Sequence, residues 1–421
     1  MTPRESLLEE LRWRGLLYQQ TEGLAEHLES GPVTAYCGFD PTAASLHVGN
    51  LIPVMLLVHL ARAGHQPIAL VGGGTAMIGD PSGKSAERPL SSAEEIAGNA
   101  SRIDAQLGRV FEAAGAGSVT MRNNAEWLLE LNAVDFMRDV GKHFTVNYML
   151  AKDSVQSRLE GGISYTEFSY MLLQAYDYLQ LARTEGVSLQ VGGSDQWGNL
   201  TAGTELVRRS GGGDAHALTA PLLTTASGKK FGKTEGGAVW LDADLTSPYE
   251  FYQFWVNSTD ADVGRFLKVF TFLEKAAIAD LEGAVAKAPQ ARRAQKALAK
   301  EVTTLIHGAD AARVAEEASR VIFDKKVDPA AIADEVYVML AESIPTVRLP
   351  KAAELSVLDV LEQAFALSRG AGRKLVQQGG VTVNGEKLSA EALTVPRDRA
   401  VRGRWFLLRK GGRDIALADV G

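Results

Sequence analysis

The feature that most constrains the fold is a strand–helix–strand pattern early in the chain. The segment VTAYCGF at 33–39 is apolar and rich in strand-forming residues, and GNLIPVMLLVHLARAG at 49–64 predicts a buried helix that ends at a glycine. A second strand, PIALVGG at 67–73, also runs into glycines. Strand, helix and strand in this order over about 40 residues form a βαβ unit, which predicts a parallel sheet.

The segment VSLQVGG at 187–193 predicts a further strand, because it is apolar and is followed by polar residues. In open parallel sheets, ligands bind beyond the carboxyl ends of the strands, where such polar loops lie. We therefore expect an α/β domain with a Rossmann-like parallel sheet and a ligand site at this edge.

The chain has 421 residues, which exceeds the size of one hydrophobic core and predicts two or three domains. After Pro248 the sequence is rich in alanine and predicts helices, of which 291–308 is the clearest, while 342–355 predicts a connector. The last segment combines a helix at 366–380 with short strands. The predicted domains are a Rossmann-like parallel-sheet domain at 1–247, an all-α domain at 248–325, a linker at 326–349 and a small α+β domain at 350–421.

The charge is distributed unevenly along the chain. The formal net charge is −7, but residues 365–421 contain 11 lysines and arginines against five acidic residues. Such an asymmetry predicts an appended module that meets a polyanion, although a solvated basic surface is the simpler alternative.

Composition also bears on the compartment. No apolar run reaches the 18 or so residues that span a membrane, and the charged N-terminal segment lacks the apolar core of a signal peptide. The single cysteine, Cys37, cannot form an internal disulfide, and the histidines show no zinc-ligand spacing. We therefore expect a cytoplasmic protein with no membrane partner and no metal held by side chains.

The glycine-rich segment GGGTAMIGDPSGKS at 72–85 does not fit the two common nucleotide-binding motifs. A Walker loop needs a glycine where Ile78 stands, and the dinucleotide motif needs its third glycine where Met77 stands. Cys37 has no base beside it in the sequence that would activate a nucleophile, so a buried thiol is the simpler interpretation.

The segment YCGFDPTAASLHVGN at 36–50 joins the first strand to the first helix. His47 and Asn50 stand three residues apart at the predicted amino end of that helix, where free backbone N–H groups and the helix dipole attract phosphate. Gly49 would let a flat base approach the backbone closely. A lone histidine at a helix start is more often a cap, so the whole segment carries the prediction.

Two lysines lie on the glycine-rich segment LTTASGKKFGKTEGG at 223–237. Lys230 and Lys233 flank Phe231 and Gly232, and two ammonium groups on a glycine-hinged loop suit the stabilisation of charge in phosphoryl chemistry. Alone, such a loop is usually solvated surface. Together with the HVGN segment it predicts a nucleotide-activating site.

The predicted helix at 164–181 carries a polar stripe. Tyr170, Gln174 and Asp177 stand at i, i+4 and i+7, so they lie on one face of an otherwise apolar helix. Buried polar groups are unfavourable unless something satisfies them. The stripe therefore predicts either a substrate-binding face or internal hydrogen bonds to the sheet.

Together these segments resemble the class I aminoacyl-tRNA synthetases, in their bacterial tyrosyl branch. HVGN corresponds to the HIGH signature of the family, KFGKT to its KMSKS loop, and YCGFDPT is typical of tyrosyl members. Asn50 replaces the second histidine, and its amide can donate to a phosphate oxygen but cannot carry positive charge. Phe231 and Gly232 replace methionine and serine, while both lysines remain.

The resemblance implies a tyrosine pocket. Its α-amino end would be held by Asp80, Tyr170 and Gln174, and Gln196 would lie near the carboxylate. Asp177 and Tyr36 would bind the phenolic hydroxyl. Phenylalanine would leave these two groups buried and unpaired, which is the recognised basis of discrimination in this enzyme family.

The resemblance also implies an ATP site. The reacting groups it implies are Thr42, His47, Asn50, Lys230 and Lys233. The ATP contacts it implies are Cys37, Gly38, Asp40, His47, Gly49, Asn50, Gly193, Asp195, Lys230, Phe231 and Lys233, with Lys84 and Arg88 near pyrophosphate or tRNA. We expect ATP to bring Mg²⁺ held mainly by phosphate oxygens and water, so no metal site made by the protein is expected.

The tail GAGRKLVQQGGVTVNGEKL resembles the S4-type RNA-binding domain, with a β-turn at Asn384-Gly385. It would contact tRNA through Arg369, Arg373 and Lys374. Within the helix at 291–308, a basic stripe at i, i+4 and i+8 fits RNA contact and a solvated helix face equally well; it consists of Arg292, Lys296 and Lys300.

The implied reaction has two steps. The carboxylate of L-tyrosine attacks the α-phosphate of ATP to give tyrosyl-adenylate, and the terminal ribose hydroxyl of tRNA(Tyr) then attacks the activated carbonyl. The family works as a homodimer, so a homodimer is expected. The alternatives are an RNA-binding protein that keeps the synthetase scaffold without catalysis, against which the intact His47 and lysines argue, and a small-molecule adenylyltransferase, against which Tyr36 and Asp177 argue.

Overall fold

The computed structural model describes residues 6–82, 91–117, 119–228, 231–234, 237–324, 327–349, 353–411 and 414–421. The chain forms two compact units. The first unit contains Met1–Asp242 and Ser258–Leu298, and the second contains Ala243–Asn257 and Ala299–Gly421. Three of the predicted site residues, Lys84, Arg88 and Lys230, lie outside the described residues.

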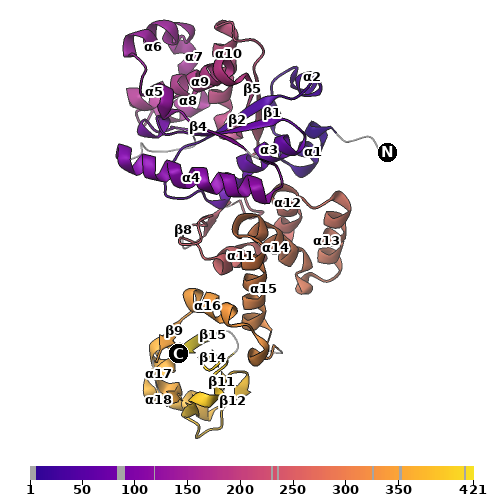
Figure 1. Cartoon of the computed structure of the whole chain (residues 1–421), viewed down its shortest axis with the longest axis vertical. Coiled ribbons are helices and arrows are strands. Elements are labelled where there is room, and N and C mark those ends of the chain that lie inside the picture. Colours follow the sequence, from indigo (N-terminus) through magenta and orange to yellow (C-terminus); the bar gives the residue numbers. More distant parts are fainter. Residues whose placement is uncertain are drawn as a thin grey trace. The chain divides into compact units, whose positions relative to one another are not determined.

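A six-stranded sheet forms the centre of the first unit (Figure 1). In spatial order its strands are β1 (Gln19–Gln20), β6 (His216–Ala220), β5 (Val187–Gly193), β2 (Thr34–Phe39), β3 (Gln66–Val71) and β4 (Thr120–Asn123). The strands from β6 to β4 are parallel to their neighbours, which confirms the predicted parallel sheet. The edge strand β1 is antiparallel to β6 and was not predicted, because two residues show no apolar alternation.

Helices cover both faces of this sheet. They are α1 (Leu7–Arg14), α2 (Leu24–Glu29), α3 (Leu51–Arg62), α4 (Ala93–Ala113), α5 (Ala125–Leu128), α6 (Ala133–Asp139), α7 (Val146–Leu150), α8 (Asp153–Leu159), α9 (Tyr165–Glu185) and α10 (Trp197–Arg209). Two further helices of the unit, α12 (Asp260–Phe270) and α13 (Lys275–Lys287), come later in the chain. The predicted βαβ unit is β2, α3 and β3.

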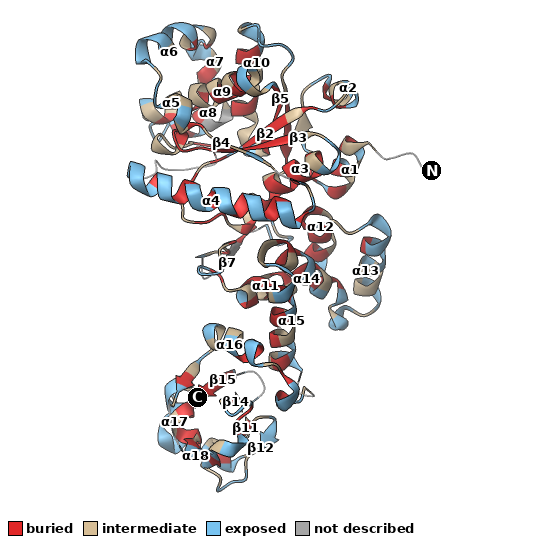
Figure 2. Ribbon diagram, in the orientation of Figure 1, coloured by how far each residue is buried: buried red, intermediate tan, exposed pale blue. Residues whose placement is uncertain are grey.

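The core of the first unit lies on either side of the sheet. On one face, Met171 and Ala175 of α9 pack with Tyr36 of β2 and Ile68 of β3. On the other face, α3 lies along β2, β3 and β5. Figure 2 shows the resulting burial in the strands, while α4 has one buried and one exposed side.

Local signals account for the bounds of α9, the helix that carries the polar stripe. The Ser164 hydroxyl accepts the backbone N–H of Glu167 at its start, and Gly186 ends it in the left-handed conformation with φ 66°. Near the start, Glu167 and Arg158 form a buried ion pair at 2.8 Å. The helix predicted at 164–181 is thereby confirmed and extends to Glu185.

The second unit ends in a small α+β domain. A five-stranded sheet has the order β12 (Glu386–Lys387), β11 (Val381–Val383), β14 (Trp405–Lys410), β15 (Asp414–Asp419) and β9 (Thr346–Arg348). A second ladder pairs β10 (Glu354–Ser356) with β13 (Thr394–Pro396). The remaining helices are α11 (Pro248–Val256), α15 (Ala309–Phe323), α16 (Asp334–Ser343), α17 (Val357–Phe365) and α18 (Arg369–Gln377).

Two sequence expectations about this unit have clear outcomes. The β-turn at Asn384-Gly385 is confirmed, since both residues have positive φ, 49° and 84°, and join β11 to β12. The stretch 326–349 was expected to be a linker, but it contains α16 and β9. The buried apolar positions of α16 are Val336, Tyr337 and Leu340. This apolar pattern is short and lies close to prolines, which are typical of connectors.

The predicted helix at 291–308 is α14 (Arg293–His307), and the division between the two units falls within it. Arg292 precedes α14 in the left-handed conformation, with φ 50°, and donates to the carbonyl of Ser258 at 3.2 Å. Arg292 therefore does not continue a basic stripe on this helix, which corrects that prediction. The domain boundaries predicted at 247, 325 and 349 group the chain differently from the two units and stay predictions. None of the described helices is long and apolar enough to cross a membrane.

Candidate active site

The order of the strands defines where a ligand site is expected. From β2 the chain proceeds to β3 and β4 on one side, and β5 and β6 then add to the other side. The topological switch point therefore lies between β2 and β5, and crevices at such points bind ligands in open α/β sheets. Asp40 directly follows β2, and Asp195 and Gln196 follow β5 on the short helix η4 (Ser194–Gln196).

A buried tyrosine and a buried aspartate lie on the α9 side of this crevice. Tyr36 of β2 and Asp177 of α9 have exposed fractions of only 1% and 2%. The Tyr36 hydroxyl is buried and has no hydrogen-bond partner among the described residues. Asp177 accepts hydrogen bonds from Asn124 Nδ2 at 2.9 Å and from Trp127 Nε1 at 2.7 Å.

Burial sets the titration of both groups. It raises the pKa of Asp177 to about 7, against the lowering effect of the hydrogen bonds from Asn124 and Trp127, and Asp40 raises it further. Burial also raises the pKa of Tyr36 well above its usual range, and the Asp177 carboxylate adds to this. Tyr36 therefore keeps its proton, and an unpaired buried hydroxyl beside a carboxylate suits a polar ligand group.

Sequence reasoning missed Thr75, Asn124 and Trp127. Thr75 Oγ1 donates to Asp40 Oδ1 at 2.8 Å, and Asn124 Nδ2 donates to both Thr75 Oγ1 at 3.0 Å and Asp177 Oδ2. These bonds form a continuous chain from Asp40 to Asp177. A signal was present, because Thr75 and Asn124 are polar residues that follow the parallel strands β3 and β4.

The glycines after β3 leave room for this chain of bonds. A Cβ on Gly72 would stand 2.0 Å from Asp40 Oδ1 and 2.5 Å from Thr75 Oγ1. A Cβ on Gly73 would stand 2.4 Å from the side-chain oxygen of Asn123. The glycine-rich segment that failed both nucleotide motifs therefore has a steric role in the site.

The three side chains of the polar stripe on α9 differ in whether other side chains of the protein satisfy them. The Tyr170 hydroxyl donates to Asp40 Oδ2 at 2.9 Å. Asp80, which the resemblance placed beside Tyr170 and Gln174, accepts from Gln196 Nε2 at 2.6 Å. The Gln174 side-chain oxygen is buried without a partner among the described residues. The stripe is thus satisfied at Tyr170 and Asp177 by internal bonds, and Gln174 keeps an acceptor for a ligand.

The HVGN segment forms a compact turn before α3. His47 Nδ1 accepts the backbone N–H of Gly49 at 3.0 Å, and Asn50 Oδ1 accepts that of His47 at 3.0 Å. His47 is therefore a helix cap in this structure. The His47 ring also lies edge-on to Trp240, with centroids 6.2 Å apart.

The described part of the lysine segment lies against the HVGN turn. A Cβ on Gly232, whose φ is 82°, would stand 3.0 Å from Val48 Cγ2 and 3.3 Å from the Gly49 nitrogen. Phe231 is buried. Lys233 opens the strand β7 (Lys233–Thr234), which pairs with β8 (Gly237–Ala238).

The remaining predicted ATP contacts lie around the same edge. Cys37 is a buried thiol, as the sequence indicated, and burial raises its pKa to about 12. Gly38 and Thr42 are exposed at the end of β2 and just beyond it. A Cβ on Gly193 would stand 2.6 Å from Asp195 Oδ1, so this glycine brings the backbone close to that carboxylate.

The predicted RNA contacts lie on α18 in the second unit. Arg369 pairs with Asp359 and, at 3.4 Å, with Glu362, while Arg373 and Lys374 are exposed. Lys374 and Lys410 line an open cavity of about 720 Å³ together with Asp414. Lys410 is paired with Asp414 at 2.7 Å, so part of the positive charge on this concave surface is neutralised within the protein.

Comparisons with known proteins identify the family. Residues 28–324 match the family described as tRNA synthetases class I (W and Y). Residues 337–418 match the tyrosine–tRNA ligase SYY-like C-terminal domain. The first match covers more than half of the chain and places it among the class I synthetases for tryptophan and tyrosine.

Full-length relatives distinguish the two amino acids. The chain is 53% identical to a tyrosine–tRNA ligase of Anaeromyxobacter dehalogenans over 419 residues, which cover 99% of this chain and all of that protein. It is 49% identical to a tyrosine–tRNA ligase of Bacillus caldotenax, across 98% of this chain and 99% of that protein. A C-terminally truncated mitochondrial tyrosyl-tRNA synthetase of Aspergillus nidulans has a TM-score of 0.70 at 32% identity, covering 76% of this chain and 95% of that one. The chain therefore belongs to the tyrosine–tRNA ligase family, whose members join tyrosine to tRNA using ATP.

Proposed function

We propose that the residues gathered between β2 and β5 bind tyrosine and ATP and perform the adenylation step of this ligase. One observation carries the proposal: Tyr36 and Asp177 are buried together at the switch point, and the Tyr36 hydroxyl has no partner among the described residues. A phenolic hydroxyl can donate to the Asp177 carboxylate and accept from Tyr36, so tyrosine satisfies both groups.

The other end of the amino acid binds among carboxylates. Asp80 offers negative charge to the α-ammonium group, and the Gln174 oxygen, which has no partner among the described residues, accepts one of its protons. Tyr170 holds Asp40, and Gln196 holds Asp80, so both carboxylates have fixed positions. Gln196 is bonded to Asp80, so a tyrosine whose ammonium group binds Asp80 has its carboxylate within reach of Gln196.

The ATP triphosphate binds at the HVGN turn. His47 Nε2 and the Asn50 amide donate to phosphate oxygens, with help from the amino end of α3. Lys230 and Lys233 stabilise the charge that develops as pyrophosphate leaves. The remaining assignments are Asp195 at the ribose, Cys37, Gly38, Asp40, Thr42, Gly49, Gly193 and Phe231 along the nucleotide, and Lys84 and Arg88 at pyrophosphate.

The chemistry needs no protein nucleophile. The tyrosine carboxylate oxygen attacks the α-phosphorus, a P–O bond forms, and the bond to the bridging oxygen breaks to release pyrophosphate. The terminal ribose hydroxyl of tRNA(Tyr) then attacks the carbonyl carbon, and AMP leaves as the ester forms. Mg²⁺ enters with ATP as part of the substrate, held by phosphate oxygens and water. The protein contributes alignment and fixed charge.

The small C-terminal domain binds tRNA through α18. Arg373 and Lys374 are exposed there, and Arg369 joins them by exchanging its carboxylate partners for phosphate. Because translation takes place in the cytoplasm, we place the enzyme there. The affinity for tRNA should fall as the salt concentration rises, because salt cations compete with arginine and lysine for the RNA phosphates.

The chain also works as a homodimer. Large apolar side chains are exposed in the segment from α5 to the start of α9, namely Leu129, Val134, Met137, Val146, Leu159 and Tyr165. Such a concentration marks a protein interface. Sedimentation of the wild type should give a dimer, and Tyr165→Asp should give a monomer; a wild type that sediments as a monomer at micromolar concentration would refute this assignment.

Exchange of labelled pyrophosphate into ATP tests the adenylation proposal. Each of the twenty amino acids is added separately to the purified protein with Mg²⁺. Exchange with tyrosine that is lost on chelation of Mg²⁺ supports the assignment. If Lys233→Ala or His47→Ala exchanged at the wild-type rate, the assignment of the ATP site would be wrong even though the family is established.

A further inference from the structure

A buried carboxylate outside the site is the starting observation. Asp262, on α12, has an exposed fraction of 2%, and the reaction proposed above does not use it. Its Oδ1 accepts the backbone N–H of Ala226 at 2.8 Å, and its Oδ2 accepts the Thr259 hydroxyl at 2.7 Å. Ala226 lies in the segment that leads to the two lysines, so Asp262 ties this segment to α12.

A second side chain of α12 holds the same segment. Arg265 donates to the carbonyl of Thr224, and it forms an ion pair with Asp262 at 3.2 Å. The arginine thus partly neutralises the buried carboxylate and adds a second tie to the backbone. Buried charges are retained when they are paired and hydrogen-bonded in this way.

The end of the segment at Phe231 also packs on α12. The Phe231 ring lies 5.0 Å from that of Phe266 and 5.2 Å from that of Phe270, and it is stacked on the latter. The Phe231 N–H donates to the carbonyl of Leu223 at 3.1 Å, which closes the base of the segment. Both ends of the stretch 224–231 are therefore fixed by one helix.

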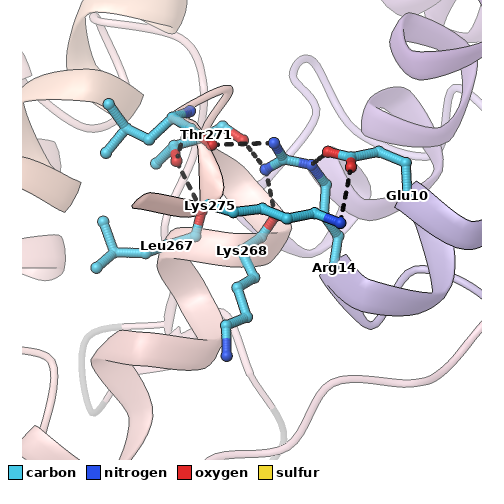
Figure 3. A network of polar contacts seen from close by, with 7 residues as sticks. Glu10, Arg14, Leu267, Lys268, Thr271 and Lys275 are labelled. Atoms are coloured by element: carbon cyan, nitrogen blue, oxygen red, sulfur yellow. Dashed lines mark hydrogen bonds and ion pairs between the residues drawn. The ribbon is translucent and has the colours of Figure 1, made fainter. Parts of the chain in front are cut away.

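The helix is itself anchored. Arg14 of α1 is buried and donates to the carbonyls of Lys268 at 3.0 Å, Thr271 at 2.7 Å and Leu273 at 3.0 Å, as Figure 3 shows for the first two. These carbonyls lie at and beyond the carboxyl end of α12, where helices leave acceptors unsatisfied. Glu10 pairs with Arg14 at 2.6 Å. The helix α12 consequently has a fixed position beside α1.

From these contacts we propose that α12 is the platform that holds the segment leading into Lys233 at the HVGN turn for adenylation, with Asp262 and Phe270 as positioning residues. Phe231 stands between the two lysines in sequence, and Gly232 lies so near the HVGN turn that a Cβ on it would stand 3.3 Å from the Gly49 nitrogen. Fixing Phe231 on α12 therefore fixes where the lysine segment meets the triphosphate. The inference rests on the proposed roles of the lysines.

The proposal makes a specific kinetic prediction. Asp262→Ala should lower kcat in tyrosine-dependent pyrophosphate exchange by about tenfold or more, because small misplacements of charged groups slow catalysis strongly. The equilibrium affinity for tyrosine should not change, since neither Asp262 nor Phe270 touches its pocket. Phe270→Leu should act in the same direction. Asp260→Ala is the matched control, because Asp260 begins the same helix but pairs with Gln295.

A double-mutant cycle with Lys233→Ala is the test. In the Lys233→Ala background, Asp262→Ala should slow exchange by a smaller factor than in the wild type, because one of the two lysines on the segment is gone. The proposal is overturned if Asp262→Ala and Phe270→Leu exchange at the wild-type rate, if both weaken tyrosine binding in parallel with kcat, or if their effects add fully to that of Lys233→Ala. Full activity of Lys233→Ala alone would instead overturn the proposed role of the lysine.

Discussion

The raised pKa of Asp177 leads to a prediction about how tyrosine binding depends on pH. Burial raises this pKa to about 7 in the structure without ligand. A carboxylate accepts the substrate phenol more strongly than a carboxylic acid, because hydrogen bonds to charged groups are the stronger ones. Tyrosine should therefore bind preferentially to the ionised form, and affinity should be lost as the pH falls through 7.

The size of the effect follows from the pKa. With a pKa of about 7, about nine-tenths of Asp177 is ionised at pH 8 and about one-tenth at pH 6. In the limit where only the ionised form binds, the dissociation constant for tyrosine rises about tenfold between pH 8 and pH 6. Residual binding to the acid form would make the rise smaller.

Equilibrium binding of tyrosine can be followed by equilibrium dialysis with labelled tyrosine, which does not depend on the fluorescence of Trp127 beside Asp177. Titrations of the wild type from pH 5.5 to 8.5, in steps of about half a unit, should show a midpoint near 7. Asp177→Asn is the control, because the amide cannot titrate. Any pH dependence of the affinity that this variant still shows comes from other groups. A wild-type affinity that is constant above pH 5, or a variant with the same profile, would refute the reasoning.

Three further predictions concern other parts of the chain. Asn124→Ala removes a hydrogen bond to the buried Asp177, so the preference for tyrosine over phenylalanine in pyrophosphate exchange should fall by about 10- to 100-fold, the equivalent of roughly 1.5–3 kcal/mol. Burial lowers the pKa of His59 from 6.5 to about 3, so folded His59 stays neutral and the free energy of unfolding decreases as the pH falls below 6.5. In urea unfolding, the wild type should lose about 2 kcal/mol more of its free energy of unfolding between pH 8 and pH 5 than His59→Leu loses. Arg373→Ala should weaken tRNA binding and reduce the slope of log affinity against log salt by about one, whereas an unchanged slope would remove this arginine from the interface.

The sequence predicted the elements that frame the site because their signals are local. Apolar runs marked β2, β3 and β5, and the last two of these runs end in glycines. A serine cap and a closing glycine mark the ends of α9. The carboxyl-edge rule then predicted a ligand site at the polar loops that follow these strands, and the resemblance named Asp40 and Gln196 there. The resemblance to the synthetases supplied the reaction, which the comparisons support.

Long-range partners were not accessible from the sequence in the same way. Asn124 and Asp177 are separated by 53 residues, and their bond depends on β4, a short strand without a strong apolar pattern. The buried Asp262 looked like an ordinary acidic residue in the first turn of a helix. Its backbone partner Ala226 stands 36 residues earlier, and no spacing rule connects the two.

The measurement that tests the central claim most directly is the ratio of kcat/KM for tyrosine over phenylalanine in pyrophosphate exchange, in the wild type and in Tyr36→Phe. The claim is that Tyr36 and Asp177 select the substrate through its phenolic hydroxyl. Removing the Tyr36 hydroxyl should lower the ratio by about 5- to 15-fold, the equivalent of roughly 1–1.5 kcal/mol, mainly through tyrosine. A ratio that stays at the wild-type value would contradict the account, because the buried hydroxyl would then have no part in selecting tyrosine.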